Sequence, residues 1–75
     1  MNFGDNMTIA RKRKGLSQKD LAKLVGNAPL TISRYERGEI TPPVDVAKKI
    51  AEVLDVSLDY LVGSTKTMVD RSLVQ

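Results

Sequence analysis

The sequence contains no cysteine, no histidine and no tryptophan, and its only aromatic residues are two tyrosines and one phenylalanine. Without cysteine, a disulfide framework and a thiolate metal site are excluded. Without histidine, the most frequent general base and metal ligand is missing. No apolar run approaches the roughly 18 residues that a membrane span needs, and no basic-then-apolar leader opens the chain. We therefore expect a small cytoplasmic domain that is not an enzyme and uses no cofactor.

Charge is distributed unevenly along the 75 residues, whose net charge at pH 7 is +3. Residues 11–37 include eight basic and two acidic side chains, a local net charge of +6. Residues 38–75 include four basic and six acidic side chains, a local net charge of −2, and Asp5 supplies the remaining negative charge. This asymmetry favours a polyanionic partner that meets one face. A solvated, lysine-rich helix face explains the charge alone equally well.

Hydrophobic periodicity and capping signals predict one all-α domain, because the chain is too short for two cores. The five predicted helices cover residues 6–14, 18–25, 29–37, 43–54 and 58–62. We expect Asp5 or Asn6 to cap the first helix, Ser17 and Asp20 to form a capping box before the second, and Ser57 to cap the fifth. Glycines that can end helices follow at positions 15, 26, 38 and 63.

The apolar spacing also predicts which side chains face the core. The expected inward residues are Met7, Ala10, the stem of Lys14, Leu21, Leu24, Val25, Ile32, Tyr35, Ala47, Ile50, Ala51 and Leu54. Residues 1–63 then form the domain, and residues 64–75 form a tail. Thr67 and Asp70 can cap a sixth helix in that tail, which we expect to be the start of a further helix or a dimerisation segment.

Four residues follow the spacing of a helix-turn-helix: Ala22, Gly26, Ile32 and Tyr35. Two short helices that cross at roughly 90–120° need a tight turn, and Gly26 can supply the positive φ of that turn. Ala22 is small enough to let the helices approach, Ile32 helps to fill the wedge between them, and Tyr35 faces the remaining core. Each residue alone is a weak signal, but all four in register inside a basic segment indicate a helix-turn-helix.

Three segments carry a resemblance to a known family: GLSQKDLAKLVG, LTISRYERG and DVSLDYLVG. Together they resemble the Cro/cI-type (XRE-like) helix-turn-helix family over residues 7–63. The resemblance implies a compact, lambda-repressor-like bundle of five helices that binds double-stranded operator DNA. It also implies a homodimer on a palindromic site, and we expect residues 56–62 and the tail to be its pairing surfaces. The expected function is a transcriptional regulator, most often a repressor.

The same resemblance implies roles for individual residues. The residues matched to phosphate contacts are Ser17, Gln18, Arg37 and Thr41, and those matched to base-facing positions are Ala28, Pro29, Leu30, Ser33 and Arg34. Arg34 can pair with two acceptors of guanine, and Leu30 can contact a thymine methyl group. The alternatives are that Arg34 touches only a phosphate and that Leu30 folds back on its own helix. Ser17 can be a cap alone, and Gln18 can be a solvated amide.

The resemblance also implies that Arg11 pairs with Glu36. Such an ion pair would tie the first helix to the third, so we expect Arg11 to be structural although its charge suits DNA. The sequence departs from the family at Asn27 and Ala28, where an apolar residue and a hydroxyl cap are usual. Asn27 is then a candidate cap, which would move the start of the third helix by one residue.

A second hypothesis assigns the chain to another class. An antitoxin-like or adaptor module would bind a protein and would not use its third helix on DNA. The apolar Leu30 and the apolar residues of the tail favour this hypothesis slightly. We expect no membrane, metal or small-molecule ligand under either hypothesis, and no catalytic residue, because no paired carboxylates or phosphate-binding glycine loop occur.

Overall fold

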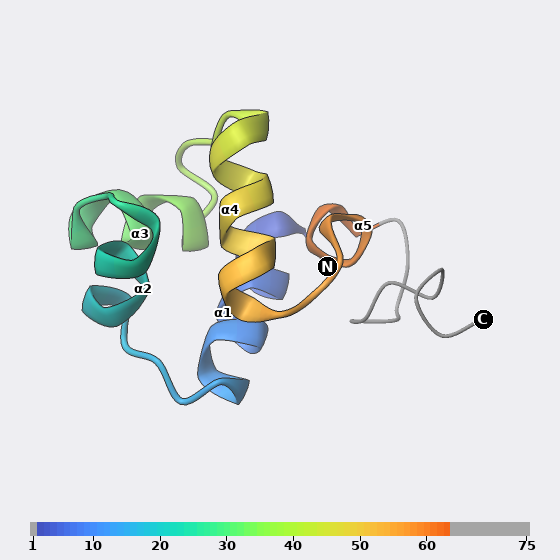
Figure 1. Ribbon diagram of the computed structural model, residues 1–75. Helices are drawn as coiled ribbons and strands as arrows, with labels where there is room; N and C mark the ends of the chain where they lie inside the picture. Colours follow the sequence, from blue (N-terminus) through green and yellow to red (C-terminus); the bar gives the residue numbers. More distant parts are fainter. Residues whose placement is uncertain (1, 64–75) are drawn as a thin grey trace.

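The computed structural model describes residues 2–63, and this part of the chain contains five α-helices and no β-strand (Figure 1). The helices are α1 (Phe3–Arg13), α2 (Gln18–Val25), α3 (Pro29–Glu36), α4 (Val44–Leu54) and α5 (Leu58–Val62). The predicted all-α fold is therefore confirmed, with every boundary but one within a single residue of the prediction. The tail and its predicted sixth helix lie outside the described residues.

The start of α1 differs from the prediction. Asn2 caps the helix, because its Oδ1 accepts a hydrogen bond of 2.9 Å from the backbone N–H of Asp5. The expected cap at Asp5 or Asn6 is therefore wrong. Asn6 is instead buried inside the helix, where its Nδ2 donates to the carbonyl oxygen of Tyr60 at 2.9 Å. This side chain ties α1 to α5.

The predicted caps of α2 and α5 are confirmed. Ser17 Oγ accepts from the backbone N–H of Asp20 at 2.9 Å, and a carboxylate oxygen of Asp20 accepts from the backbone N–H of Ser17 at 3.0 Å. These bonds lower the pKa of Asp20. At α5, Ser57 Oγ accepts from the backbone N–H of Tyr60 at 3.0 Å. The serine caps therefore define where α2 and α5 begin.

Residues from all five helices share one core. Its buried members are Met7, Ala10, Leu21, Ala22, Ile32, Tyr35, Ile50, Ala51, Leu54, Tyr60 and Leu61. Of the other predicted inward residues, Ala47 is buried and Val25 is half-buried against this core, but Leu24 and Lys14 are exposed. Leu24 is 53% exposed because the buried face of α2 is centred between Leu21 and Ala22, with Leu24 on the other flank. Lys14 is exposed because it follows the last residue of α1.

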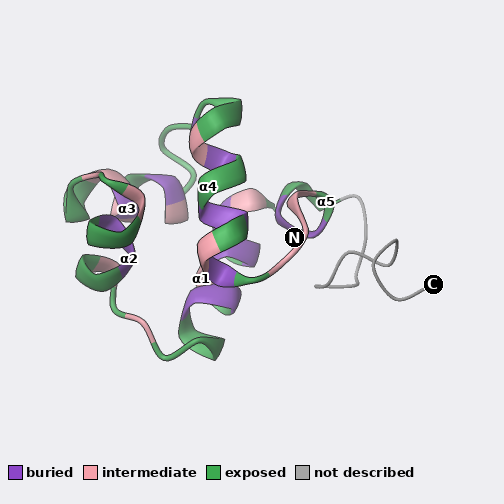
Figure 2. Ribbon diagram, in the orientation of Figure 1, coloured by how far each residue is buried: buried purple, intermediate pink, exposed green. Residues whose placement is uncertain are grey.

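The helices α2 and α3 form a pair whose outer surface is exposed. α2 and α3 lie together on one side of α4, and α5 lies on the other side (Figure 1). The outer surfaces of α2 and α3 are largely exposed, while their facing surfaces are buried (Figure 2). Among the described helices, none is both long and apolar enough to cross a membrane.

Candidate nucleic-acid interface

The turn between α2 and α3 is built by backbone geometry. Gly26 ends α2 with a φ of 76°, in the left-handed region that glycine adopts without a steric penalty. The backbone N–H of Asn27 then donates to the carbonyl oxygen of Ala22 at 2.8 Å. Asn27 therefore belongs to the end of α2, and the expectation that it caps α3 is wrong. Ala28 is the N-cap residue and makes no side-chain hydrogen bond.

Pro29 explains how α3 begins without a side-chain cap. Proline at the first helical position has a suitable φ and no N–H to satisfy. α3 turns Ile32 and Tyr35 into the core and leaves its other face outside. The N-terminal end of that outer face is exposed to solvent (Figure 2).

The residues matched to base-facing positions lie on this outer face. Ala28, Pro29, Leu30 and Arg34 are exposed, and Ser33 is half-buried. Leu30 is 63% exposed, so it does not fold back on its own helix to escape water. On this face the leucine can make apolar contacts with a partner, and the nearby arginine can donate hydrogen bonds to the same partner.

The N-terminus of α2 lies beside the C-terminus of α3. Gln18 is neither a free surface amide nor an isolated side chain, because its Nε2 donates to Glu36 Oε1 at 3.0 Å. This hydrogen bond joins the start of α2 to the end of α3 and was not predicted from the sequence. Ser17 is exposed beside it, with its hydroxyl oxygen used as a cap.

An ion pair beneath this surface connects α1 to α3. Arg11 Nε lies 2.6 Å from Glu36 Oε2, and Arg11 Nη2 lies 3.1 Å from Glu36 Oε1. The side chains are only 10% and 5% exposed. Arg11 Nη1 also donates to the carbonyl oxygen of Leu16 at 2.8 Å, which fixes the α1–α2 loop. The Arg11 guanidinium is thus turned inward and is not among the exposed basic side chains.

Glu36 is the common acceptor of these contacts. Burial raises the pKa of its carboxyl, but the hydrogen bonds and charge of Arg11, together with the amide of Gln18, outweigh that effect, so the net pKa is lowered. The carboxylate is therefore ionised at neutral pH and holds three elements of the structure together. Within the described residues, no buried side-chain nitrogen or oxygen lacks a hydrogen-bond partner.

Two arginines at the end of α3 share one acidic partner. Arg34 Nε donates to Glu39 Oε1 at 3.5 Å, and Arg37 Nε lies 2.8 Å from Glu39 Oε2. All three side chains are about half exposed. Thr41 is exposed in the turn that follows. Nothing in the local sequence pattern of Glu39 indicates these partners.

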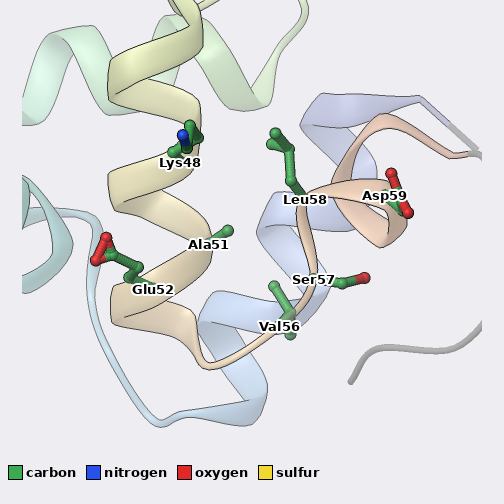
Figure 3. Close-up of a pocket in the computed structure, with 7 residues that line it drawn as sticks. All are labelled: Lys48, Ala51, Glu52, Val56, Ser57, Leu58 and Asp59. Atoms are coloured by element: carbon green, nitrogen blue, oxygen red, sulfur yellow. The ribbon is translucent and has the colours of Figure 1, made fainter. Parts of the chain in front are cut away.

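A shallow groove lies on the other side of the molecule, between α4 and α5 (Figure 3). It is lined by Lys48, Ala51, Glu52, Val56, Ser57, Leu58 and Asp59. Its lining combines apolar side chains with one basic and two acidic residues. Among the described residues, no group of three or more acidic side chains is placed to hold a metal ion.

Comparison with known proteins identifies the family pattern. A family model described as helix-turn-helix matches residues 9–61, which include all of α2, α3 and α4. The HTH-type transcriptional regulator YqaE of Bacillus subtilis is 37% identical over 59 residues, covering 79% of this chain and 51% of YqaE. The chain spans about half the length of the curated relatives it matches.

Two solved structures have the same arrangement of helices. The P22 c2 repressor, crystallised in complex with a synthetic operator, matches 87% of this chain and 98% of its own, with a TM-score of 0.82 and 29% identity. The N-terminal DNA-binding domain of SinR from Bacillus subtilis matches 79% of this chain and 87% of its own, with a TM-score of 0.73 and 37% identity.

Proposed function

We propose, because the chain belongs to the Cro/cI-type helix-turn-helix family, that it is a repressor-like transcriptional regulator that binds a specific DNA operator. In this proposal the N-terminal part of α3 enters the major groove, and the start of α2 and the turn after α3 contact the phosphate backbone. The chain's relatives point to a DNA-binding regulator, and its matches to enzymes cover only their helix-turn-helix region, so the proposed mechanism is occupancy of a site.

The observation that carries the proposal is the presentation of α3. Its outer face is exposed, its first residues have no side-chain cap, and Arg34 and Arg37 stand at its end. Hydrogen bonds from Arg11 and Gln18 to Glu36 hold that end against α1 and α2. A rigid helix that projects between basic side chains suits the major groove of B-form DNA. The operator-bound P22 c2 repressor supports this arrangement.

The proposed phosphate contacts come from four residues. Ser17 and Gln18 lie at the N-terminus of α2, where free N–H groups and the helix dipole favour an anion. Gln18 has a second amide hydrogen and a carbonyl oxygen beyond its bond to Glu36, so positioning and phosphate binding are compatible. Arg37, at the end of α3, and Thr41, in the turn that follows, supply exposed donors. These contacts set affinity and register without reading sequence.

Base readout is proposed for the outer residues of α3. Arg34 can make a bidentate pair with guanine, Ser33 can bond a base edge, and Leu30 can contact a thymine methyl group. Ala28 and Pro29 present only small apolar surfaces. Because hydrogen-bonding side chains are few, DNA deformability is expected to contribute to specificity.

Arg34→Ala tests the readout directly. We expect the affinity for the operator to fall by about 1–3 kcal/mol, or roughly 5- to 150-fold, with selectivity relaxed at one base pair. Gln18→Ala is the matched control, because loss of a phosphate contact weakens all duplexes about equally. Binding of both variants would be measured by fluorescence anisotropy on duplexes that differ at single positions. If Arg34→Ala binds every duplex as the parent does, α3 does not read the operator as proposed.

We further propose that two chains bind as a homodimer to a palindromic operator. One half-site offers limited contact, and residues 56–62 beside the α4–α5 groove include Val62, which is 55% exposed. Selection of bound duplexes from a random DNA pool would return the operator. Inverted half-sites centred about 10 base pairs apart, or a multiple of this, are expected. A single unrepeated half-site would contradict the dimer.

Salt dependence separates DNA binding from the alternative of a protein-interaction module. The exposed Leu30 is the observation that favours the alternative, since an apolar side chain also suits a protein partner. If a dimer neutralises about six phosphates, the logarithm of its affinity for the selected duplex should fall with log salt at a slope near −5. An affinity for duplex DNA that does not change between low and high salt would favour the protein-interaction module.

A further inference from the structure

Glu39 places a carboxylate between the two arginines that the proposed function assigns to DNA. The backbone fixes its position. The N–H of Gly38 donates to the carbonyl oxygen of Tyr35 at 3.1 Å, and the N–H of Glu39 donates to the carbonyl oxygen of Arg34 at 3.0 Å. With Gly38 at a φ of 75°, these two bonds form a Schellman motif at the end of α3. Glu39 is therefore held above the last turn of the helix that carries both arginines.

The contacts are made with a particular edge of each guanidinium. Glu39 Oε1 faces Arg34 Nε at 3.5 Å, and Glu39 Oε2 faces Arg37 Nε at 2.8 Å. A guanidinium carries five N–H donors in a rigid plane, and only one of them is on Nε. A carboxylate on the Nε side restrains the orientation of that plane and leaves the terminal Nη groups for another acceptor. The Nη pair can bind the O6 and N7 atoms of guanine or the oxygens of a phosphate.

The charge of Glu39 acts in a second way. A carboxylate at the C-terminus of a helix is disfavoured by the helix dipole, and it also repels phosphate groups. At this position it partly neutralises two exposed arginines and lowers the attraction between the surface and any duplex, whatever its sequence. Positioning of Arg34 supports a complex with the correct base, whereas repulsion of phosphate weakens all complexes. Both effects increase the ratio of specific to non-specific affinity.

We propose that Glu39 is a specificity-determining residue of the DNA interface, acting by positioning Arg34 and Arg37 and by disfavouring complexes that rely on phosphate contacts alone. This inference rests on the proposed function, because it needs α3 to meet a duplex. Glu39 touches no base in this proposal. Its effect on base selection passes through Arg34.

The test compares the parent chain with Glu39→Gln on two duplexes. One is the best site selected from a random pool, and the other is a duplex of equal length and unrelated sequence. Loss of one exposed charge is expected to raise affinity for the unrelated duplex about threefold per subunit, or about tenfold for a dimer. Affinity for the selected site should change by less than threefold. Removing the charge relieves the repulsion of phosphate, but it also loses the positioning of Arg34, and the two effects oppose each other. The selectivity ratio should therefore fall severalfold.

Two further variants separate the contributions. Asp55→Asn makes the same change in net charge at the exposed end of α4, where asparagine also adopts the left-handed backbone conformation, and should leave the selectivity ratio unchanged. Glu39→Asp keeps the charge but shortens the side chain, so it cannot hold both Nε groups. It should leave affinity for the unrelated duplex unchanged and weaken the selected site, mainly at the base pair that Arg34→Ala also relaxes. Thermal melting would confirm that all three variants fold, as expected for exposed positions.

The outcomes distinguish this inference from the function on which it rests. A Glu39→Gln variant with the parent's selectivity ratio, or an Asp55→Asn variant with an equal loss of selectivity, would overturn the role of Glu39 while leaving sequence-specific binding intact. A parent chain that binds both duplexes equally would instead refute the proposed function.

Discussion

Arg11→Ala is expected to lower the free energy of unfolding by about 3–5 kcal/mol, the range for removing one partner of a buried ion pair. The substitution leaves the carboxylate of Glu36, whose side chain is 5% exposed, without its cationic partner. It also removes the donor to the carbonyl oxygen of Leu16. A chain of 75 residues has a total stability of roughly 4–11 kcal/mol, so this single change can unfold a large fraction of the molecules.

Urea denaturation followed by circular dichroism would measure the loss. Lys12→Ala is the matched control, because it removes one positive charge from the neighbouring, exposed position on the same helix. We expect that control to change stability by less than about 0.5 kcal/mol. If Arg11→Ala does not fold, the double substitution Arg11→Met with Glu36→Met should recover part of the stability, since it removes both charges. Equal midpoints for Arg11→Ala and Lys12→Ala would show that the ion pair contributes nothing.

The pH dependence gives an independent signature of the same pair. The folded-state pKa of Glu36 is lowered from its ordinary value of 4.5. The unfolded chain therefore binds a proton more readily, and stability rises with pH across this region. The contribution of Glu36 is fully present above about pH 5 and is lost as the pH falls from the ordinary value toward the lowered one. In Arg11→Ala this acid-dependent step should be smaller than in the parent.

Local signals in the sequence were sufficient for most of the fold. The capping box of Ser17 and Asp20, the cap at Ser57 and the left-handed Gly26 all act within one turn, so their residue types reveal them. The error at the start of α1 occurred where a distant contact decided between equivalent local choices. Asn6 has the residue type of a cap, but the carbonyl oxygen of Tyr60, 54 residues away, holds it inside α1.

The candidate interface was less predictable than the fold for the same reason. Family resemblance predicted which side chains on α3 can meet DNA, and it also supplied the pairing of Arg11 with Glu36. The bonds of Gln18 to Glu36 and of Glu39 to two arginines depend on how helices cross and how α3 ends. No spacing rule within one helix generates them. The sequence therefore offered candidate DNA contacts, which stay predictions, and one supporting ion pair, but not the bonds of Gln18 and Glu39.

Gly4→Ala is expected to destabilise the fold by about 3 kcal/mol, the upper end of the range for overpacking. Gly4 is buried in the first turn of α1, against the last turn of α3. A methyl group there would meet the carbonyl oxygen of Glu36 and would lie 2.8 Å from the carbonyl oxygen of Tyr35. Both are backbone atoms, so no side-chain rotation can relieve the contact. α1 and α3 must separate instead.

The sign of the change makes this prediction decisive. In a helix without tertiary contacts, replacing glycine by alanine would stabilise the chain by about 0.5–1 kcal/mol. A lower midpoint of thermal unfolding thus requires the close approach of α1 to α3, and an unchanged or higher midpoint would contradict it. The folded fraction of the variant should also bind the selected duplex more weakly. Displacing the last turn of α3 moves Glu36, and with it the anchor that holds α3 in the orientation of the proposed DNA complex.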